Sequence, residues 1–392
     1  MSTWVILGCG FIGTRLARSL LADNEPVLVC GRNKEHLVAL EGEGASAYVF
    51  DATRTRAFTH AMTSLRAPVV VYCLPPIPGF PGGEIVSRAT AGALAAGANR
   101  FIYLSSTSVY GEGRDGEVVD EDSPTAISDN DARPYLSAEG AVDNARNNGL
   151  DGLIFRLTPV YGKGRGVRER LLAGTYKLLD GGEHIYSRIH VDDVVGIIRT
   201  AAERAPINAT YCLADDHPCP QKEYADWLAD HLGVKKPTSV PSLAPGMPRR
   251  RIRNRAVSNA RIKSELDYAF RYPTYREGEL AIDAELGVQG KDVAMPPLVV
   301  HRRADLGKIA EASELHRLQL GHRSLAAGSK DRISASGESV VQVLQGEIQV
   351  VQGEESHTLG AGDLVEVPSF GLEVEATDKN QDPAQLLIIT AR

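Results

Sequence analysis

The chain has 392 residues, of which 43% are hydrophobic and 24% charged, a composition that excludes a disordered or fibrous protein. At roughly 150 residues per domain, this length predicts two or three folded units. The 43 Lys and Arg against 50 Asp and Glu give a formal charge of −7, which excludes a global positive field for nucleic acid or anionic membrane. No apolar run approaches the roughly 20 residues that span a bilayer, and Trp4 already begins a strand-like run, which leaves no room for a signal peptide. We therefore expect a cytoplasmic protein without nucleic-acid or membrane partners.

The first 160 residues alternate short β-branched runs with helix-like segments, which is typical of a parallel sheet with crossover helices. Helices are predicted over Thr14 to Ala22 and Ile85 to Ala96. The pattern indicates an α/β fold with a doubly wound parallel sheet. The predicted strands are Trp4 to Leu7, Val27 to Cys30, Ala47 to Phe50, Val69 to Leu74, Phe101 to Ser105 and Leu153 to Leu157.

A mixed region follows from about Arg188. It contains a strand-like run from Thr210 to Leu213, an amphipathic helix around Lys222 to Leu232, and a Pro-rich connector over residues 237–248. Such a smaller lobe usually carries substrate contacts. We expect one unit over residues 1–288, with its substrate lobe built mainly from about 160–180 and 210–285.

The last hundred residues change character after the MPP at 295–297 and read almost entirely as short strands separated by glycine-containing turns. This spacing predicts a separate all-β sandwich or jelly roll over 289–392. The predicted strands are Leu315 to Leu320, Ser339 to Leu344, Ile348 to Val351, Leu364 to Val367, Leu372 to Ala376 and Gln385 to Thr390.

A GxGxxG motif stands between the first predicted strand and the first helix. Gly8 permits a tight turn, Gly10 lets the backbone approach a pyrophosphate, and Gly13 lets the helix pack on the strand. Phe11 and Ile12, inside the motif, and Leu74, at the end of the fourth strand, complete the predicted cofactor-binding loop. Strand, turn and helix occur in the required order, so we predict dinucleotide binding.

The end of the second strand reads VCGRN and lacks the acidic residue that would bind a ribose 2′-hydroxyl. Arg32 stands there instead, and a guanidinium suits a 2′-phosphate, which favours NADP over NAD. Asp51, after the third strand, is a candidate acceptor for the adenine amino group. Either residue could instead be an ordinary solvated loop side chain.

Five motifs in order carry a family resemblance: GCGFIG, YLSSTSVYGE, RLTPVYGKGR, RIHVDDVV and SNARIKSEL. Together they resemble an extended short-chain dehydrogenase/reductase, and within it the atypical YeeZ-like group of NAD-dependent epimerase/dehydratase-like proteins. The resemblance covers roughly residues 1 to 285. It implies a Rossmann fold, an NAD(P) cofactor and a site near the strand ends, while the substrate stays open.

The resemblance also implies a catalytic Ser and a YxxxK pair. Ser106 matches the Ser that binds the substrate oxygen, and Tyr135 matches the Tyr, but Glu139 stands at the Lys position. A carboxylate one turn from Tyr135 would disfavour its phenolate, so carbonyl reduction, with Tyr135 as a neutral proton donor, is favoured over oxidation. From the sequence alone we expect Glu139→Lys to raise activity, and Arg133, Lys163 or Arg165 to be sources of the missing positive charge.

Five arginines in PRRRIRNR form a local basic cluster in an otherwise acidic protein. In related extended enzymes this lobe meets the phosphates of a nucleotide-sugar, which makes Arg249, Arg251 and Arg253 candidate substrate contacts. The alternative is a solvated basic loop. The cluster is short and lacks interleaved aromatics, which argues against nucleic-acid binding.

The segment from Glu338 to Val374 resembles a cupin. A metal-binding cupin needs an HxH pair, a Glu and a later His, and these positions fall near Ile333, Ala335 and Leu372 or Glu373, so we expect no metal. Cupin sheets commonly pair across subunits, and we therefore expect a metal-free binding or dimerisation module and a homodimer.

Two functions stay open at this point. The first is an NAD(P)-dependent reductase or epimerase-like enzyme that uses Ser106 and Tyr135 on a carbonyl or nucleotide-sugar substrate. The second is a non-catalytic NADP-binding sensor or scaffold, which Glu139 favours. We lean to the enzyme.

Overall fold

The computed structural model divides into two compact units, Met1–Arg271 and Tyr272–Arg392. The boundary predicted at 288 and 289 stays a prediction. The structure describes residues 2–54, 56–113, 115–242, 253–287, 300–301, 318–325, 330–333, 339–345, 347–352, 355–361, 363–367, 372–376 and 384–391.

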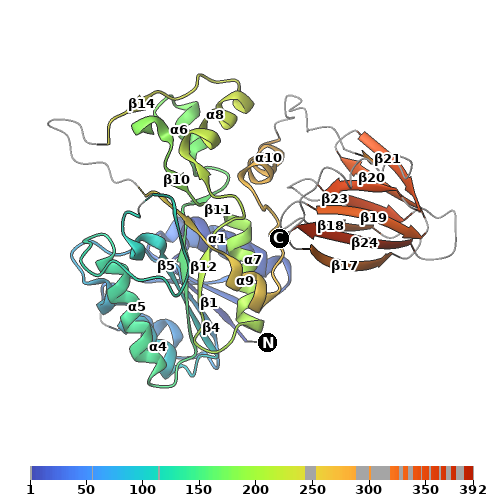
Figure 1. Ribbon diagram of the computed structural model, residues 1–392. Coiled ribbons are helices and arrows are strands. Elements are labelled where there is room, and N and C mark those ends of the chain that lie inside the picture. The colour runs from blue at the N-terminus through green and yellow to red at the C-terminus, as the bar shows by residue number, and fades with distance from the viewer. Residues whose placement is uncertain are drawn as a thin grey trace. The chain divides into compact units, whose positions relative to one another are not determined.

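The first unit is built on a seven-stranded parallel sheet in the order β12-β7-β5-β4-β1-β2-β3 (Figure 1). The order reverses between β1 and β4, which is where ligands bind in doubly wound sheets. This confirms the predicted Rossmann-type sheet. The strands are β1 (Trp4–Leu7), β2 (Val27–Gly31), β3 (Ser46–Val49), β4 (Val69–Tyr72), β5 (Arg100–Ser106), β7 (Gly152–Leu157) and β12 (Thr210–Leu213).

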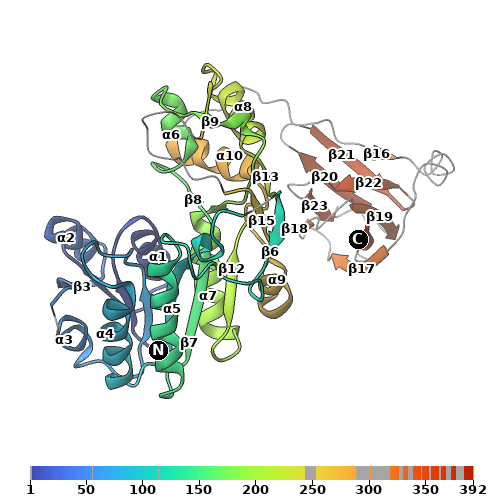
Figure 2. The ribbon, with the colours of Figure 1, turned by 60° about the vertical axis from the view of Figure 1, so that its left-hand side comes forward.

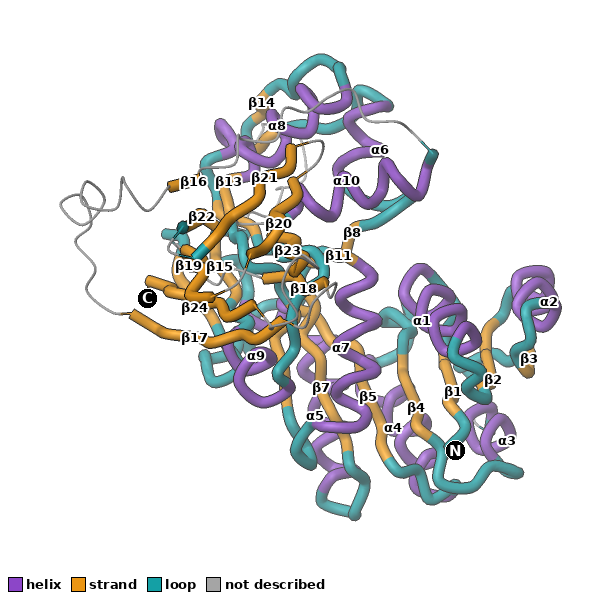
Figure 3. The backbone as a smooth tube through the Cα atoms, turned by 90° about the vertical axis from the view of Figure 1, so that its right-hand side faces the viewer, coloured by secondary structure: helices purple, strands orange, loops and turns teal. Residues whose placement is uncertain are grey.

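Helices cover both faces of this sheet because its strands alternate side chains between two apolar layers (Figure 3). Ile6 of β1 packs with the layer that holds α1, α2, α7 and α9, whereas Val5 packs with the layer of α3, α4 and α5. The helices are α1 (Phe11–Ala22), α2 (Lys34–Gly42), α3 (Ala57–Met62), α4 (Gly82–Ala95), α5 (Arg133–Arg146), α7 (Val191–Arg204) and α9 (Ala260–Leu266).

A small lobe of the first unit lies beyond the carboxyl ends of the strands (Figure 2). It contains a short strand, Ser239–Val240, inside the segment that the sequence indicated only as a connector. Its elements are α6 (Val167–Leu172), β9 (Leu178–Leu179), η2 (Asp180–Gly182), β10 (Ile185–Tyr186), β13 (Cys219–Pro220), α8 (Gln221–Leu232) and β14 (Ser239–Val240). Short pairings connect lobe and sheet: β6 (Glu117–Val119) with β15 (Arg255–Val257), and β8 (Val160–Tyr161) with β11 (Ile189–His190).

The second unit begins with helix α10 (Tyr275–Leu286) and continues as two antiparallel sheets, in the orders β16-β22-β19-β24-β17 and β18-β23-β20-β21. The predicted all-β character agrees with these sheets, and the cupin resemblance stays a prediction. No helix in the described part of the chain is both long and apolar enough to cross a membrane. The strands are β16 (Val300–His301), β17 (Leu318–Leu325), β18 (Lys330–Ile333), β19 (Ser339–Gln345), β20 (Glu347–Gln352), β21 (Glu355–Gly360), β22 (Leu364–Val367), β23 (Leu372–Ala376) and β24 (Ala384–Ala391).

Candidate active site

The glycine loop between β1 and α1 is shaped by three different steric demands. Gly8 has a φ of +107°, and a Cβ there would approach Leu74 Cδ2 at 2.8 Å. A Cβ on Gly13 would overlap the carbonyl oxygen of Gly8. A Cβ on Gly10, the N-cap of α1, would meet no atom of the described residues within 4 Å, so the outer side of Gly10 is open. The loop therefore has the shape in which a ligand phosphate can approach the backbone.

A cavity of about 410 Å³ adjoins this loop. Its lining includes five residues that the sequence predicted for cofactor binding, namely Gly8, Gly10, Arg32, Asp51 and Leu74. The other three, Phe11, Ile12 and Gly13, lie in the first turn of α1, outside that lining. These residues fit a dinucleotide, because the glycines leave the backbone accessible and the cavity continues to the ends of β2 and β3.

The side chains at the far end of this cavity are polar. Asp51 accepts hydrogen bonds from the backbone N–H and the hydroxyl of Thr53, at 3.0 and 2.8 Å, and these bonds lower the pKa of its carboxyl group. Arg32 is exposed, and His36 hydrogen-bonds the hydroxyl of Thr14 at 2.8 Å. Asp51 is the one acidic residue among the described residues of the lining.

Phe11 connects the glycine loop to the segment after β8. The guanidinium carbon of Arg165 lies 5.2 Å from the centroid of the Phe11 ring, within the range of a cation–π contact. Arg165 was one of three predicted sources of positive charge, and this contact places it at the start of α1 rather than beside Glu139.

Ser106 ends β5 and starts a short 3-10 helix, η1 (Thr107–Tyr110). Its hydroxyl accepts from the backbone N–H of Ser108 at 3.1 Å and lies 3.0 Å from the Ser108 hydroxyl. Arg253 donates to the same Ser108 hydroxyl at 2.8 Å. The structure thus brings two predicted site residues, Ser106 and Arg253, to one place through a serine that the sequence analysis did not single out.

Glu139 does not act as the sequence analysis expected. Its carboxylate is buried, accepts from the Ser105 hydroxyl at 2.6 Å, and forms an ion pair with Arg156 through bonds of 2.9 and 3.2 Å. Arg156 also donates to the Tyr110 hydroxyl at 2.9 Å. Neither Arg156 nor Ser105 was among the expected partners. The prediction of an uncompensated negative charge beside Tyr135 is therefore wrong, because the Arg156 guanidinium compensates the Glu139 carboxylate.

Tyr135 lies in the first turn of α5, half-buried. It packs against an apolar cluster that contains Val109 and Tyr110 of η1, the turn that follows Ser106. Among the described residues, none hydrogen-bonds the Tyr135 hydroxyl. Ser106 and Tyr135 therefore border the same turn, and their joint catalytic role stays a proposal.

Arg255 binds the backbone of η1. Its guanidinium donates to the carbonyl oxygens of Thr107, at 2.5 Å, and Gly111. Burial and the neighbouring Arg253 lower the pKa of Arg255 to about 10. Arg253 and Arg255 of the basic cluster therefore both contact η1. Arg249 and Arg251 lie outside the described residues, and phosphate binding by the cluster stays a prediction.

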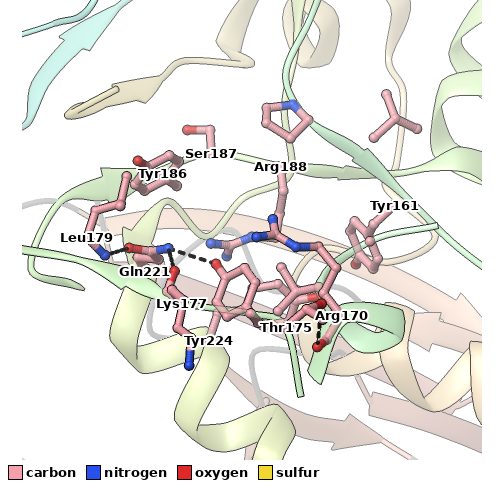
Figure 4. A pocket seen from close by; sticks show the side chains of 15 residues that line it. Tyr161, Arg170, Thr175, Lys177, Leu179, Tyr186, Ser187, Arg188, Gln221 and Tyr224 are labelled. Carbon is pink, nitrogen blue, oxygen red and sulfur yellow. Dashed lines mark hydrogen bonds between the residues drawn. The ribbon is translucent and has the colours of Figure 1, made fainter. Parts of the chain in front are cut away.

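A second cavity, of about 520 Å³, lies in the small lobe (Figure 4). Gln221 connects two other residues of the cavity lining. Its side chain accepts a hydrogen bond from the backbone N–H of Leu179 at 2.9 Å and donates one to the Tyr176 hydroxyl at 3.0 Å. None of the described residues that line it is acidic. Its cations are Arg170, Lys177 and Arg188, and its tyrosines are Tyr161, Tyr176, Tyr186 and Tyr224.

The sequence analysis missed this cavity because its lining comes from five short segments with no shared motif. Arg170 stacks on the Tyr176 ring at 4.7 Å, and Arg188 on the Tyr224 ring at 4.4 Å. The positive lining suits an anionic ligand with a planar or phosphorylated part.

One group of potential metal ligands occurs within the described ranges: His217, Cys219 and Glu223. The donors are already engaged, since His217 Nε2 lies 2.8 Å from Glu223 Oε1 and Arg188 donates to Cys219 Sγ at 3.0 Å. The expectation of no metal stays a prediction.

Comparison with known proteins agrees with this geometry. Residues 83–214 match the model of the NAD dependent epimerase/dehydratase family, and residues 4–75 match the TrkA-N domain. The first unit is similar to the NAD-dependent epimerase/dehydratase family. This confirms the resemblance predicted for the N-terminal part of the chain.

Two named proteins are similar to this chain in sequence. The chain is 28% identical over 299 residues to the 3-diazoavenalumate denitrifying reductase of a Streptomyces species, covering 69% of this chain and 96% of the relative. It is also 28% identical over 286 residues to protein YeeZ of Escherichia coli strain K12, covering 70% and 97%. The second match confirms the predicted similarity to YeeZ.

Solved structures share the fold. A functionally unknown conserved protein from Silicibacter pomeroyi is 27% identical, with a TM-score of 0.62 over 73% of this chain and 99% of that chain. UDP-glucuronic acid 4-epimerase from Bacillus cereus, solved with UDP-glucuronic acid and NAD, is 18% identical, with a TM-score of 0.61 over 73% and 99%. At 18% identity the epimerase shows the fold alone.

Proposed function

We propose that the first unit is an NAD(P)-dependent oxidoreductase that reduces a carbonyl or nucleotide-sugar substrate, with NADP preferred over NAD. The observation that carries this proposal is the cavity at the glycine loop, where Gly8, Gly10 and Leu74 meet Arg32 and Asp51. The Streptomyces relative is named as a reductase, which supports the reductive direction.

The cofactor preference rests on charge. Arg32, directly after β2, and His36, in the first turn of α2, line the cavity, and Arg32 stands where an acidic residue would bind a ribose 2′-hydroxyl. Asp51 is held by Thr53, and its second carboxylate oxygen can accept from an adenine amino group. A guanidinium at this place stabilises a 2′-phosphate.

The proposed chemistry uses the end of β5. A bound, reduced nicotinamide cofactor supplies the hydride. The Ser106 hydroxyl donates a hydrogen bond to the substrate carbonyl oxygen, and neutral Tyr135 delivers a proton to that oxygen as the carbonyl becomes a hydroxyl. Tyr135 starts protonated in this direction, and the phenolate that remains after the transfer regains a proton from solvent water. Glu139 stands where the family places a lysine.

The substrate is proposed to extend into the cationic cavity of the small lobe. Exposed Arg170 and half-buried Lys177 belong to its lining, which has no acidic side chain among the described residues. A nucleotide-sugar diphosphate or another anion has this charge.

Calorimetric titration tests the cofactor assignment. Wild type should bind NADP⁺ more tightly than NAD⁺, and Arg32→Ala should weaken NADP⁺ about 10- to 100-fold while changing NAD⁺ less than threefold. Arg66→Ala, which removes an exposed arginine of a distant loop, is the matched control. Equal loss of both cofactors in Arg32→Ala would contradict the preference.

The second candidate is a non-catalytic NADP-binding sensor or scaffold. It is favoured by Glu139, which is committed to a buried ion pair and leaves no lysine on this face of α5. The two candidates separate in a screen of carbonyl compounds with NADPH. Turnover that disappears in Ser106→Ala, with unchanged NADPH binding, supports the enzyme, whereas NADPH binding without turnover supports the sensor.

A further inference from the structure

The Ser106 hydroxyl is one end of a chain of hydrogen bonds whose other end is a guanidinium. Arg253 Nη2 donates to Ser108 Oγ at 2.8 Å, and Ser108 Oγ lies 3.0 Å from Ser106 Oγ. The Ser108 backbone N–H donates to Ser106 Oγ at 3.1 Å. A guanidinium can only donate, so one lone pair of Ser108 is always turned to Arg253.

We propose that Arg253 acts through Ser108 as a positioning residue that places positive charge behind the Ser106 hydroxyl and stabilises negative charge on whatever oxygen Ser106 binds. The identity of that oxygen as a substrate carbonyl rests on the function proposed above. The hydrogen bonds around Ser106 are independent of that function.

The direction of the hydrogen bonds explains how the charge is transmitted. With no ligand, the Ser106 hydroxyl donates to Ser108. Both groups are hydroxyls and can rotate, so when Ser106 turns its hydrogen to a ligand oxygen, Ser108 can donate to Ser106 in return. Ser106 then accepts two hydrogen bonds, from the Ser108 N–H and hydroxyl. Each bond in the chain points from Arg253 toward the ligand, and such aligned bonds reinforce one another.

The neighbouring residue fixes Arg253 in place. The Asn254 backbone N–H donates to the Glu112 carbonyl at 3.0 Å, and its side-chain oxygen accepts from the Ile185 N–H at 2.9 Å. Strand β15 follows at once and pairs with β6. A half-buried guanidinium anchored in this way does not need to be ordered when a ligand arrives.

Arg255 shows that Arg253 is not needed to hold the turn. Arg255 already binds the carbonyl oxygens of Thr107 and Gly111, at the two ends of η1. Arg253, in contrast, contacts the turn through the Ser108 hydroxyl. The first arginine is placed to support the backbone, and the second to influence a side chain.

The Arg253 backbone also contacts Tyr186, a residue of the cavity in the small lobe. Burial raises the pKa of the Tyr186 phenol, which lines that cavity, and a hydrogen bond from the Arg253 backbone opposes the rise. Arg253 therefore contacts both a residue of the cavity lining and the Ser106 chain.

The ionisable groups around this turn include Glu139 and Tyr135 on α5, and Glu117 on β6, whose charge acts on Arg255. Glu139, on the α5 side, is paired with Arg156, and Tyr135 packs against η1 from the same helix. Arg255 lies beneath the turn and adds to the positive potential.

A thiol in place of the Ser106 hydroxyl measures this potential without any substrate. In Ser106→Cys, the rate of iodoacetamide alkylation against pH gives the pKa of the new thiol. The native cysteines give little background, because burial raises the pKa of Cys9 and Cys212 to about 12 and raises the pKa of the remaining three thiols as well.

In the Ser106→Cys background, Arg253→Met should raise the pKa of the new thiol by roughly 0.5 to 1 unit. Arg253→Lys should restore most of the shift, and Arg253→Gln, which keeps a hydrogen-bond donor without charge, should not. Arg66→Met is the charge control in an exposed loop. A shift below about 0.2 unit in both Arg253→Met and Arg253→Gln, or an equal shift in the control, would overturn the proposal.

Turnover provides a second, separate readout, with 9,10-phenanthrenequinone and NADPH as the probe pair. Arg253→Met and Ser108→Ala should each lower kcat roughly 10-fold with KM changed less than threefold, and the double variant should lose no more than either single one. If the kcat loss of the double variant were the product of the two single losses, Arg253 and Ser108 would act independently, which would contradict the proposal. If the thiol shift is present and wild type reduces nothing, the proposed function fails and the role of Arg253 stands.

Discussion

The glycine loop and the start of α5 are both recognised by short motifs, yet only the first has the geometry its motif implies. In the loop, the constraint lies in the backbone: a Cβ on Gly13 would overlap the Gly8 carbonyl, and Gly8 needs a positive φ. On α5, the behaviour of Glu139 depends on side chains of β5 and β7. A motif is reliable where the function belongs to the backbone and unreliable where it belongs to partners elsewhere in the chain.

The strongest test of this comparison is Glu139→Lys. The sequence alone predicts higher activity, but the structure predicts two buried cations side by side, because Arg156 stays in place. Breaking a buried pair costs about 3–5 kcal/mol, and adding like charge costs more, so the variant should unfold at much lower denaturant or not accumulate as folded protein.

Chemical denaturation followed by circular dichroism measures this effect. Glu43→Lys is the matched control, since Glu43 pairs with Arg18 on the surface, where such pairs contribute less than about 1 kcal/mol. A Glu139→Lys protein as stable as wild type would show that Glu139 is not held by Arg156.

Two glycine variants sharpen the other side of the comparison. Gly13→Ala should lower the free energy of unfolding by about 1–3 kcal/mol, because the new methyl overlaps backbone that cannot move aside. Gly10→Ala should cost less than about 1 kcal/mol, since its Cβ meets nothing within 4 Å, yet it should weaken NADP⁺ at least 10-fold. Thermal unfolding and titration of the two variants separate these effects, and unchanged NADP⁺ affinity in Gly10→Ala would place the phosphates elsewhere.

The smallest expected effect concerns Arg165. Its contact with the Phe11 ring is exposed and contributes about 0.5–1 kcal/mol, so Arg165→Ala should leave the melting temperature almost unchanged and weaken NADP⁺ two- to fivefold. Arg204→Ala, at the exposed end of α7, is the control. A loss above 50-fold would make Arg165 a direct phosphate ligand rather than a neighbour of the loop.

The sequence by itself determined the positions of the main strands of the first unit and the place of the glycine loop. Its β-branched runs match the observed strands, and β1 and β12 agree residue for residue with Trp4 to Leu7 and Thr210 to Leu213. These features follow from local patterns, because hydrophobic alternation and glycine spacing are visible within ten or twenty residues.

Only the tertiary structure decided which charges meet. Arg156 and Glu139 are 17 residues apart, and Arg253 and Ser108 are 145 apart, so no local pattern links them. The cationic cavity has the same origin, since its lining comes from separate short segments. Electrostatic interactions depend on distance in space, and the fold sets that distance. The sequence identified Glu139 and Ser106 as candidate groups. The fold pairs Glu139 with Arg156 and places Arg253 behind Ser106 through Ser108.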